Sequence, residues 1–203
     1  MVRVSQAELV AGAIAHKVVS FPTDTVPALG VKPDSADRIY QLKQRSRDKP
    51  LILLGASVED LLPYVRYTPD ELAIWQNLMR QYLPGALTLV LPASDRVPEA
   101  INSTDSDTVG IRVPDSLIAR QILQQTGVLA TSSANISGQT TLTTMTEIGA
   151  AFPSVLVLRS EDLLLEATGS GLPSTVICWQ NQKWQILRQG SISIQEIKID
   201  QQS

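Results

Sequence analysis

Residues 109–130 read VGIRVPDSLIARQILQQTGVLA, and this stretch decides the class of fold. Its two apolar runs, at 109–113 and 128–130, predict buried strands. Between them, the residues from about Ser116 to Gln125 predict a helix, which stops at Gly127 because glycine readily leaves the helical conformation. A strand, a helix and a second strand in this order are typical of an α/β protein.

Apolar runs and capped helices alternate along the rest of the chain in the same way. Residues 5–8 form a capping box, and residues 68–71 combine an N-cap, a proline at the first helical position and an acid, so each marks the start of a helix. The elements do not form a strictly repeating unit. We therefore expect one α/β domain over residues 1–203, built as a twisted mixed open sheet with helices packed on it. The other expected elements are a helix at 35–44, strands at 18–21, 51–54, 87–91 and 155–158, and a hairpin of strands 175–179 and 184–187 that turns at Asn181-Gln182.

The composition excludes several classes of protein. With 43% hydrophobic and 18% charged residues, the chain can fill a core, so extensive disorder is not expected. The net charge of −3 argues against non-specific binding of nucleic acid by the whole surface. Cys178 is the only cysteine, which excludes an intramolecular disulfide, and we expect it to be an inert thiol in the core. The sequence contains neither a signal peptide nor a membrane span, which predicts a cytoplasmic protein that binds no membrane.

The motifs of several common enzyme classes are absent from the sequence. His16 is the only histidine, and we expect it at the surface of the first helix. The chain has no His-Glu-x-x-His, no Gly-x-Ser-x-Gly, no phosphate-binding loop of the Walker type and no Gly-x-Gly-x-x-Gly turn. We therefore expect no metal ligands, and a site that works by positioning and charge stabilisation, as phosphoryl-type transfer does.

Polar clusters follow several of the predicted strands, where ligands bind in open α/β sheets. Residues 43–49 carry four cations and one anion, a local charge of +3 on an acidic chain. These cations favour an anionic ligand, but they also oppose the dipole of the helix that ends there, and both interpretations stay open. The other clusters supply hydroxyl, amide and guanidinium groups that suit a zwitterion, a ribose or a phosphate, although each could equally be a turn or a strand end. They are residues 23–25, Thr108 with Arg112, residues 131–135, Ser174-Thr175 and residues 188–190.

Taken together, these clusters resemble the YrdC-type threonylcarbamoyl-AMP synthases from about residue 5 to residue 195. The matching motifs, in the family's order, are FPTDT at 21–25, LKQR at 42–45 with KPL at 49–51, YLPG at 82–85, GIRVP at 110–114, SANISG at 133–138, STV at 174–176 and LRQG at 187–190. The resemblance implies a YrdC-like fold around a positively lined cavity. It also implies a reaction in which L-threonine, bicarbonate and ATP give threonylcarbamoyl-AMP and pyrophosphate, for the N6-threonylcarbamoyladenosine at position 37 of tRNA.

The resemblance further implies roles for individual residues. Mg²⁺ is expected with the triphosphate of ATP, and the candidate partners beyond the substrates are double-stranded RNA or tRNA and other proteins of the same tRNA-modification pathway. Ser133 and Asn135 flank Ala134, and we expect their side chains to diverge toward threonine and nucleotide. Lys43 and Arg45 lie at a helix end, where replacement should cost only about 0.3–1 kcal/mol of stability. The implied catalytic residues are Lys43, Arg45, Ser133 and Asn135; threonine would be held by Thr25, Arg112, Ser133 and Ser174; and ATP would face Lys43, Arg45, Lys49, Thr108, Asn135, Thr143 and Arg188.

The sequence departs from the family at three places, all expected near the threonine side. Pro27-Ala28 stands where the synthases carry an aromatic residue and a glycine, Leu54 where they often carry a histidine, and Pro173 where they carry an acid. One alternative is therefore a YciO-like paralogue of the same fold, which binds nucleotide or double-stranded RNA through the cations of residues 43–49 without making the adenylate. Another is an enzyme on the same fold that uses a different amino acid.

Overall fold

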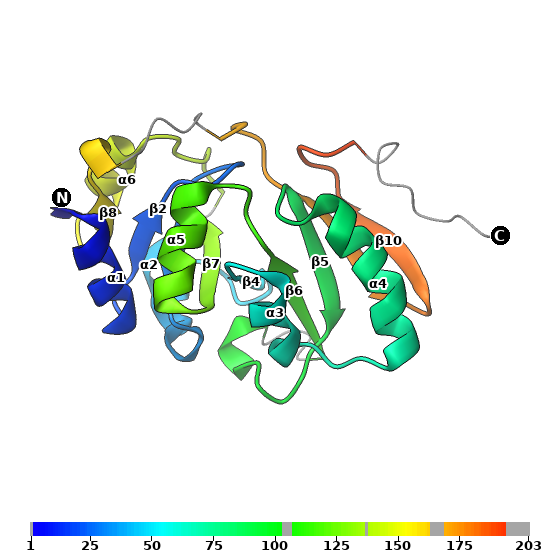
Figure 1. Ribbon diagram of the computed structural model, residues 1–203. Coiled ribbons are helices and arrows are strands. Elements are labelled where there is room, and N and C mark those ends of the chain that lie inside the picture. Colours follow the sequence, from blue (N-terminus) through cyan, green and yellow to red (C-terminus); the bar gives the residue numbers. More distant parts are fainter. Residues whose placement is uncertain (1, 103–106, 137, 163–168, 194–203) are drawn as a thin grey trace.

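In the described part of the chain, ten strands form one sheet. The computed structural model describes residues 2–102, 107–136, 138–162 and 169–193 (Figure 1). The order across the sheet is β1-β8-β2-β3-β7-β4-β6-β5-β9-β10. The strands are β1 (Val2–Val4), β2 (Val19–Phe21), β3 (Ala28–Val31), β4 (Ile52–Leu54), β5 (Leu87–Pro92), β6 (Thr108–Arg112), β7 (Leu129–Ser133), β8 (Leu156–Leu158), β9 (Thr175–Gln180) and β10 (Lys183–Arg188). The α-helices are α1 (Gln6–Ile14), α2 (Asp37–Lys43), α3 (Val58–Leu61), α4 (Pro69–Tyr82), α5 (Leu117–Thr126) and α6 (Met145–Ala151).

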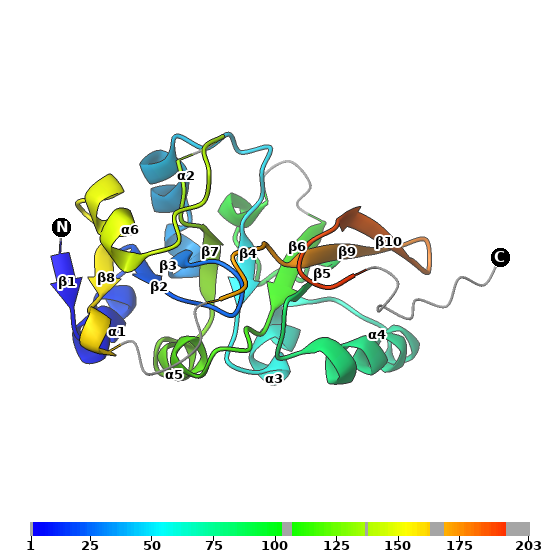
Figure 2. The same ribbon diagram turned by 90° about the horizontal axis from the view of Figure 1, so that it is seen from above.

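Helices cover both faces of this sheet. Figure 2 shows α1, α5, α3 and α4 along one face and α2 and α6 on the other. The core consists of two apolar clusters: Trp75 of α4 and Leu89 of β5 belong to one, and Phe21 of β2 and Ile122 of α5 to the other. The mixed α/β sheet with packed helices is therefore confirmed.

The strands on either side of α5 are not neighbours in the sheet. Strand β4 lies between them and pairs parallel to β6 and antiparallel to β7. Strand β5 is likewise antiparallel to β6 and parallel to β9. The sheet is mixed because it contains both parallel and antiparallel pairs, and its strand order brings residues from distant parts of the chain together.

The helix starts expected from the sequence are confirmed. Ser5 and Thr68 both form capping boxes, with Glu8 and Glu71 respectively. The helix expected at 35–44 begins later, at Asp37, because residues 33–35 form a 3₁₀ turn, and it ends at Lys43. The hairpin between β9 and β10 is also confirmed, since Asn181 and Gln182 both adopt the positive φ angles, 52° and 59°, that its tight turn requires.

Four elements were not expected: β1, β3, α3 and α6. Three of them have four residues or fewer, too few to give a periodic signal. The start of α6 was nevertheless readable, because Thr144 and Glu147 have the spacing of a capping box. Strand β7 runs to Ser133, so residues 131–133 belong to the strand and do not follow it.

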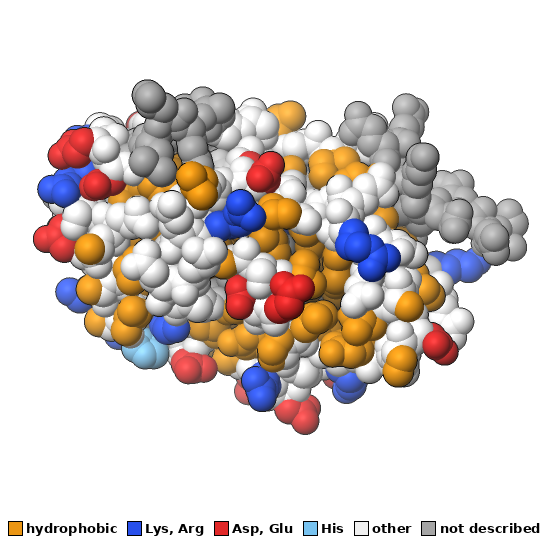
Figure 3. All heavy atoms as spheres, viewed as in Figure 1, with side chains coloured by type: hydrophobic (Ala, Val, Ile, Leu, Met, Phe, Trp, Pro, Cys, Tyr) orange, Lys and Arg blue, Asp and Glu red, His pale blue; other side chains and the backbone are white. Residues whose placement is uncertain are grey.

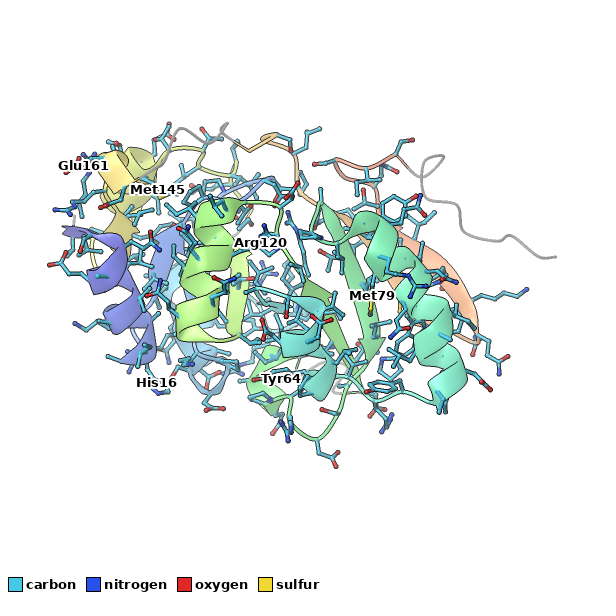
Figure 4. The ribbon with its side chains drawn as sticks, in the orientation of Figure 1. His16, Tyr64, Met79, Arg120, Met145 and Glu161 are labelled. Carbon is cyan, nitrogen blue, oxygen red and sulfur yellow. The ribbon has the colours of Figure 1, made fainter. Side chains whose placement is uncertain are left out.

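His16 lies just beyond α1, exposed at the edge of the molecule (Figure 4). Its Nδ1 lies 2.9 Å from Ser35 Oγ. Within the described part of the chain, no helix combines the length and the apolar character that a membrane span requires.

Candidate functional site

Six neighbouring strands, from β3 to β9, form the floor of a cavity of about 730 Å³. In β6, Thr108, Gly110 and Arg112 line the cavity, whereas Val109 and Ile111 are buried in the core. This arrangement follows from the pleat of a strand, which turns successive side chains to opposite faces. The strand pairing aligns one row of lining residues across the floor: Thr131, Ile52, Gly110, Val90 and Cys178.

Glycine is required at the centre of this floor. A Cβ atom at position 110 would lie 2.8 Å from Ile52 Cγ2 and 3.6 Å from Thr88 Cγ2. The first contact is shorter than two carbon atoms tolerate, so Gly110 lets the neighbouring strands place their side chains over it.

Three arginines and one acid line the cavity: Arg45, Arg112, Arg188 and Asp48. Three positive charges and one negative charge give the described lining a net charge of +2. Burial lowers the pKa of the Arg45 guanidinium from its ordinary value. A partly buried cavity with this charge favours an anionic ligand, because charge interactions strengthen away from bulk water.

Arg112 is held by contacts on all three of its nitrogens. Its Nη2 lies 2.6 Å from Asp24 Oδ1, Nη1 donates to Thr25 Oγ1 at 2.8 Å, and Nε donates to the Gly85 carbonyl at 2.9 Å. Burial lowers the pKa of Arg112, and the carboxylate of Asp24 opposes that shift. These contacts use three of the five guanidinium N–H groups, which leaves two for a ligand in the cavity.

Arg188 fixes Ser174 on the same wall. Its Nη2 donates to the Ser174 carbonyl at 2.8 Å, and Ser174 Oγ lies 2.8 Å from Thr88 Oγ1. Burial, followed by the positive charge of Arg112, lowers the pKa of Arg188. The two guanidinium groups therefore repel each other, and an anion bound between them would relieve the repulsion.

Lys43 is fully buried at the end of α2, with 0% of its surface exposed. Its Nζ donates to Ser132 Oγ at 2.8 Å, to Asn135 Oδ1 at 3.2 Å and to the Ser133 carbonyl. Burial, and then the charges of Arg45 and Lys49, lower the pKa of Lys43 to about 7. The expectation that Lys43 can be replaced at small structural cost is wrong, because truncation would leave three partly buried acceptors without their donor.

The sequence led us to expect that the side chains of Ser133 and Asn135 diverge, but in the structure they do not. Ser133 Oγ donates to Asn135 Oδ1 at 2.7 Å, so the two side chains turn toward each other. The Asn135 amide nitrogen donates to the carbonyls of Ile136 and Gln139, both at 2.9 Å. The end of β7 and the turn after it therefore form one hydrogen-bonded unit with Lys43.

The cavity brings together most, but not all, of the predicted site residues. Lys43 and Asn135 are not part of the cavity lining, but both form hydrogen bonds with Ser133, which is. Lys49 is exposed and does not line the cavity. Thr143 lines a second cavity, also of about 730 Å³, at the starts of α5 and α6. The predicted residues that line the first cavity are Thr25, Arg45, Thr108, Arg112, Ser133, Ser174 and Arg188.

Two polar residues of the first cavity, Thr88 and Asn102, were missed from the sequence, while Thr131 and Ser132 belong to the cluster of residues 131–135 but were given no role. Alternation within the strands could have revealed Thr88 and Thr131, because each follows the period of two that its strand shows. Cys178, expected to be an inert core thiol, is buried but lines the cavity. The four residues at the three places where the sequence departs from the family motifs also line it: Pro27, Ala28, Leu54 and Pro173.

Comparison with known proteins identifies close relatives. The sequence profile of the Sua5/YciO/YrdC family, described as "Telomere recombination", matches residues 14–190. A threonylcarbamoyl-AMP synthase of Pyrococcus abyssi is 34% identical over 188 residues, which cover 90% of this chain and 53% of that protein. A threonylcarbamoyl-AMP synthase of Vibrio parahaemolyticus is 35% identical over 183 residues, which cover 86% of this chain and 92% of that protein. The chain thus spans about half the length of the archaeal relative and most of the length of the Vibrio one.

Two solved structures share the fold. The crystal structure of Pyrococcus abyssi Sua5 complexed with L-threonine superposes with a TM-score of 0.82 at 31% identity, over 96% of this chain and 57% of the other. Escherichia coli YciO superposes with a TM-score of 0.78 at 21% identity, over 96% of this chain and 95% of the other. At that lower identity the likeness to YciO concerns the fold alone.

Proposed function

The chain belongs to the Sua5/YciO/YrdC family, and on this premise we propose that it is a threonylcarbamoyl-AMP synthase, a nucleotidyltransferase. Its substrates would be L-threonine, bicarbonate and ATP, and its products threonylcarbamoyl-AMP and pyrophosphate. The product would serve the formation of N6-threonylcarbamoyladenosine in tRNA, in the cytoplasm and with other proteins of that pathway. The curated synthases at 34% and 35% identity support this proposal.

One observation carries the proposal: the residues predicted for threonine line the same cavity as three of those predicted for ATP, namely Arg45, Thr108 and Arg188. Thr25, Arg112 and Ser174 come from different parts of the chain, and Arg45, Thr108 and Arg188 share the wall with them. A volume of about 730 Å³ lies within the range of roughly 300–1,000 Å³ usual for small-molecule sites. Two substrates bound in one cavity would react without a further encounter, which is a large part of catalysis by positioning.

On the threonine side, Arg112 would bind the carboxylate of the amino acid through its two remaining N–H groups. Asp24 and Thr25 hold the guanidinium in place from behind, so little side-chain freedom would be lost on binding. The hydroxyls of Ser133 and Ser174 would accept from or donate to the amine and the hydroxyl of threonine.

On the nucleotide side, Arg45 and Arg188 would neutralise phosphate oxygens, and Thr108 would bond a polar group of the nucleotide. Mg²⁺ would enter with the triphosphate, because the described residues contain no group of three or more His, Cys, Asp or Glu side chains that could hold a metal ion. The ion would add positive charge where the pyrophosphate leaves.

The reaction would proceed by capture and transfer. The threonine amine would condense with bicarbonate to a carbamate with loss of water, and a carbamate oxygen would then attack the α-phosphorus of ATP. The bond from the α-phosphorus to the bridging oxygen breaks, and pyrophosphate departs with that electron pair. Arginine charge in the cavity would stabilise the additional negative charge of this transition state.

Coupled binding tests the proposal. In calorimetry with a non-hydrolysable ATP analogue, threonine plus bicarbonate should tighten the analogue, and the analogue should tighten threonine by the same factor. Ser133→Ala should weaken this coupling, and release of pyrophosphate from ATP should require both other substrates. If threonine fails to bind under every condition, the synthase proposal fails.

A YciO-like binding protein is the second candidate, favoured by Pro27, Ala28, Leu54 and Pro173 on the cavity wall. In its RNA-binding form it needs correction, because Lys43 is fully buried and cannot reach an RNA phosphate. Figure 3 shows the face covered by α5, α3 and α4, where Lys and Arg side chains are scattered among acidic ones, while α2, which ends at Lys43, lies on the opposite face (Figure 2). Nucleotide binding that is indifferent to threonine, with no release of pyrophosphate, would support this candidate.

A further inference from the structure

We propose that Lys43 is a positioning residue, whose ammonium group holds the segment from Ser132 to Asn135 in the shape that both substrates need, without contacting ATP itself. The hydrogen bonds that define this role are present in the free protein. Their effect on turnover rests on the proposed function.

Lys43 connects two distant parts of the chain beside the cavity. It is the last residue of α2, and its side chain reaches the end of β7, a partner 89 to 92 residues further along the chain. Ser132 and Ser133 line the cavity, whereas Lys43 does not. The lysine thus supports the wall from behind.

The ammonium group has no hydrogen left for a phosphate. A charged lysine carries three N–H donors and no acceptor. The structure gives Nζ three acceptors: Ser132 Oγ, the Ser133 carbonyl and Asn135 Oδ1. With its surface fully buried as well, Lys43 would have to break an existing hydrogen bond before it could bind the triphosphate.

Lys43, Ser133 and Asn135 each contact the other two. Asn135 Oδ1 accepts from both Lys43 Nζ and Ser133 Oγ, at 3.2 Å and 2.7 Å. Lys43 also bonds the Ser133 carbonyl, so the backbone and the side chain of Ser133 are oriented by the same partners. Loss of the ammonium would free this serine to rotate, and displacement of a substrate contact by about 1 Å can reduce a rate about 100-fold.

A double-mutant cycle separates positioning from direct contact. Lys43→Met keeps the length and apolar stem of the side chain but removes its donors, and Asn135→Ala removes the shared acceptor. Each should lower kcat/KM for pyrophosphate release about 100-fold. Because both act through the same unit, the double variant should lose about 100-fold as well, and the surface variant Lys17→Met should match the wild type.

Independent losses would overturn the proposal. If Lys43 contacts ATP directly, the two losses multiply to about 10⁴-fold. Lys43→Arg keeps a charged donor at this position, so a positioning role predicts partial recovery of kcat relative to Lys43→Met, with little change in the KM for ATP. No recovery of kcat, combined with a large rise in that KM, would count for direct contact.

A ligand-free measurement keeps the inference distinct from the proposed function. In the NMR spectrum of the free protein, the side-chain amide signals of Asn135 should shift in Lys43→Met and stay unchanged in Lys17→Met. Unchanged Asn135 signals in a folded Lys43→Met would overturn the inference. If Lys43→Met does not fold, Lys43→Arg and Ser132→Ala serve in the same spectrum, since each alters the contacts of Nζ. A wild type with no pyrophosphate release but with these shifts would sink only the proposed function.

Discussion

The guanidinium of Arg112 and the carboxylate of Asp24 form a buried ion pair, with 2.6 Å between Nη2 and Oδ1 and only 5% and 14% of the two side chains exposed. Arg112 lines the first cavity and Asp24 the second, so the pair stands in the wall between them. A second ion pair, between Arg47 and Asp37 at 2.7 Å, has 51% and 52% of its side chains exposed. The two pairs have similar geometry but very different surroundings.

Removal of the buried carboxylate should therefore destabilise the protein far more than removal of the exposed one. Asp24→Asn leaves the Arg112 charge buried without compensation, which typically costs about 3–5 kcal/mol in the free energy of unfolding. Asp37→Asn, the matched control, should cost less than about 1 kcal/mol because water solvates Arg47. Denaturant unfolding of the two variants measures both values, and equal losses would contradict the difference in burial.

The stability conferred by Lys43 should depend on pH. Its pKa is lowered from 10.5 to about 7 by burial and by the charges of Arg45 and Lys49, whereas the acceptors on Ser132, Ser133 and Asn135 favour the charged form. Between about pH 7 and pH 10.5 the unfolded chain thus binds more protons at this lysine than the folded one. The wild type should gain stability relative to Lys43→Met as pH rises through this window, by at most about 1.4 kcal/mol per pH unit, and lose that gain as pH falls through about 7.

The free energy of unfolding of the wild type and of Lys43→Met, measured at several pH values from 6 to 9, gives the difference in stability between them. Groups that titrate in the same way in both proteins largely cancel in this difference. A difference that stays flat would mean that the three hydrogen bonds keep Lys43 protonated throughout this range. The Asn135 side-chain signals provide an internal check, since they should shift with the same midpoint as the stability difference.

Most of the helices and strands could be predicted from the sequence because the longer ones have clear local signals at their ends. The caps at Ser5 and Thr68 and the turn at Asn181-Gln182 are local signals that tertiary structure had no reason to override. Strand β3 was missed because it has four residues and directly follows the Pro22–Pro27 turn, where nothing in the pattern separates a strand from a loop. The strand order was not predictable, since no local pattern specifies that β4 lies between β6 and β7.

The candidate site was predictable only as a set of residues, not as an arrangement. The burial of Lys43 depends on contacts with residues about 90 positions away, and a cation at a helix end looks in the sequence like a surface charge. In the same way, we expected the side chains of Ser133 and Asn135 to diverge because Ala134 separates them, but residues two apart in an extended chain lie on the same face, and the two side chains meet where β7 ends. Alternation along β6 was the signal that could have shown which of its side chains face the cavity.

Gly169 should be intolerant of a side chain although it is far in sequence from the site. A Cβ atom there would lie 2.4 Å from the Thr23 carbonyl oxygen and 2.5 Å from that of Thr25. Neighbouring backbone bonds hold this approach, since Ser170 and Gly171 donate to Asp24 and Thr25 at 2.9 Å each. Gly169→Ala should therefore displace the segment that carries Thr25.

We expect Gly169→Ala to cost about 1–3 kcal/mol in stability, as overpacking usually does, and to weaken threonine binding measured by calorimetry. Gly171→Asn is the matched control, because its surroundings are open and asparagine tolerates its φ of 73°. Wild-type binding in both variants would show that the loop adapts without moving Thr25.

The amino-acid specificity should differ from that of a family member with the usual motifs. Pro27, Ala28, Leu54 and Pro173 all line the cavity that also holds Thr25 and Arg112, so the changes alter the wall of the cavity that contains the proposed threonine subsite. Threonine exceeds serine by one methyl group, which a well-fitted apolar pocket converts into about 1–3 kcal/mol of discrimination. A wall reshaped by two prolines and a leucine should fit that methyl group less closely. We therefore expect threonine to be accepted with a preference over serine near the lower end of that range, about tenfold.

Competition between the two amino acids for a limiting amount of enzyme, with both adenylate products quantified by mass spectrometry, gives the ratio of kcat/KM directly. The synthase of Vibrio parahaemolyticus, assayed in parallel, supplies the reference. A preference equal to or stronger than that reference would show that the four substitutions leave the methyl-binding wall unchanged.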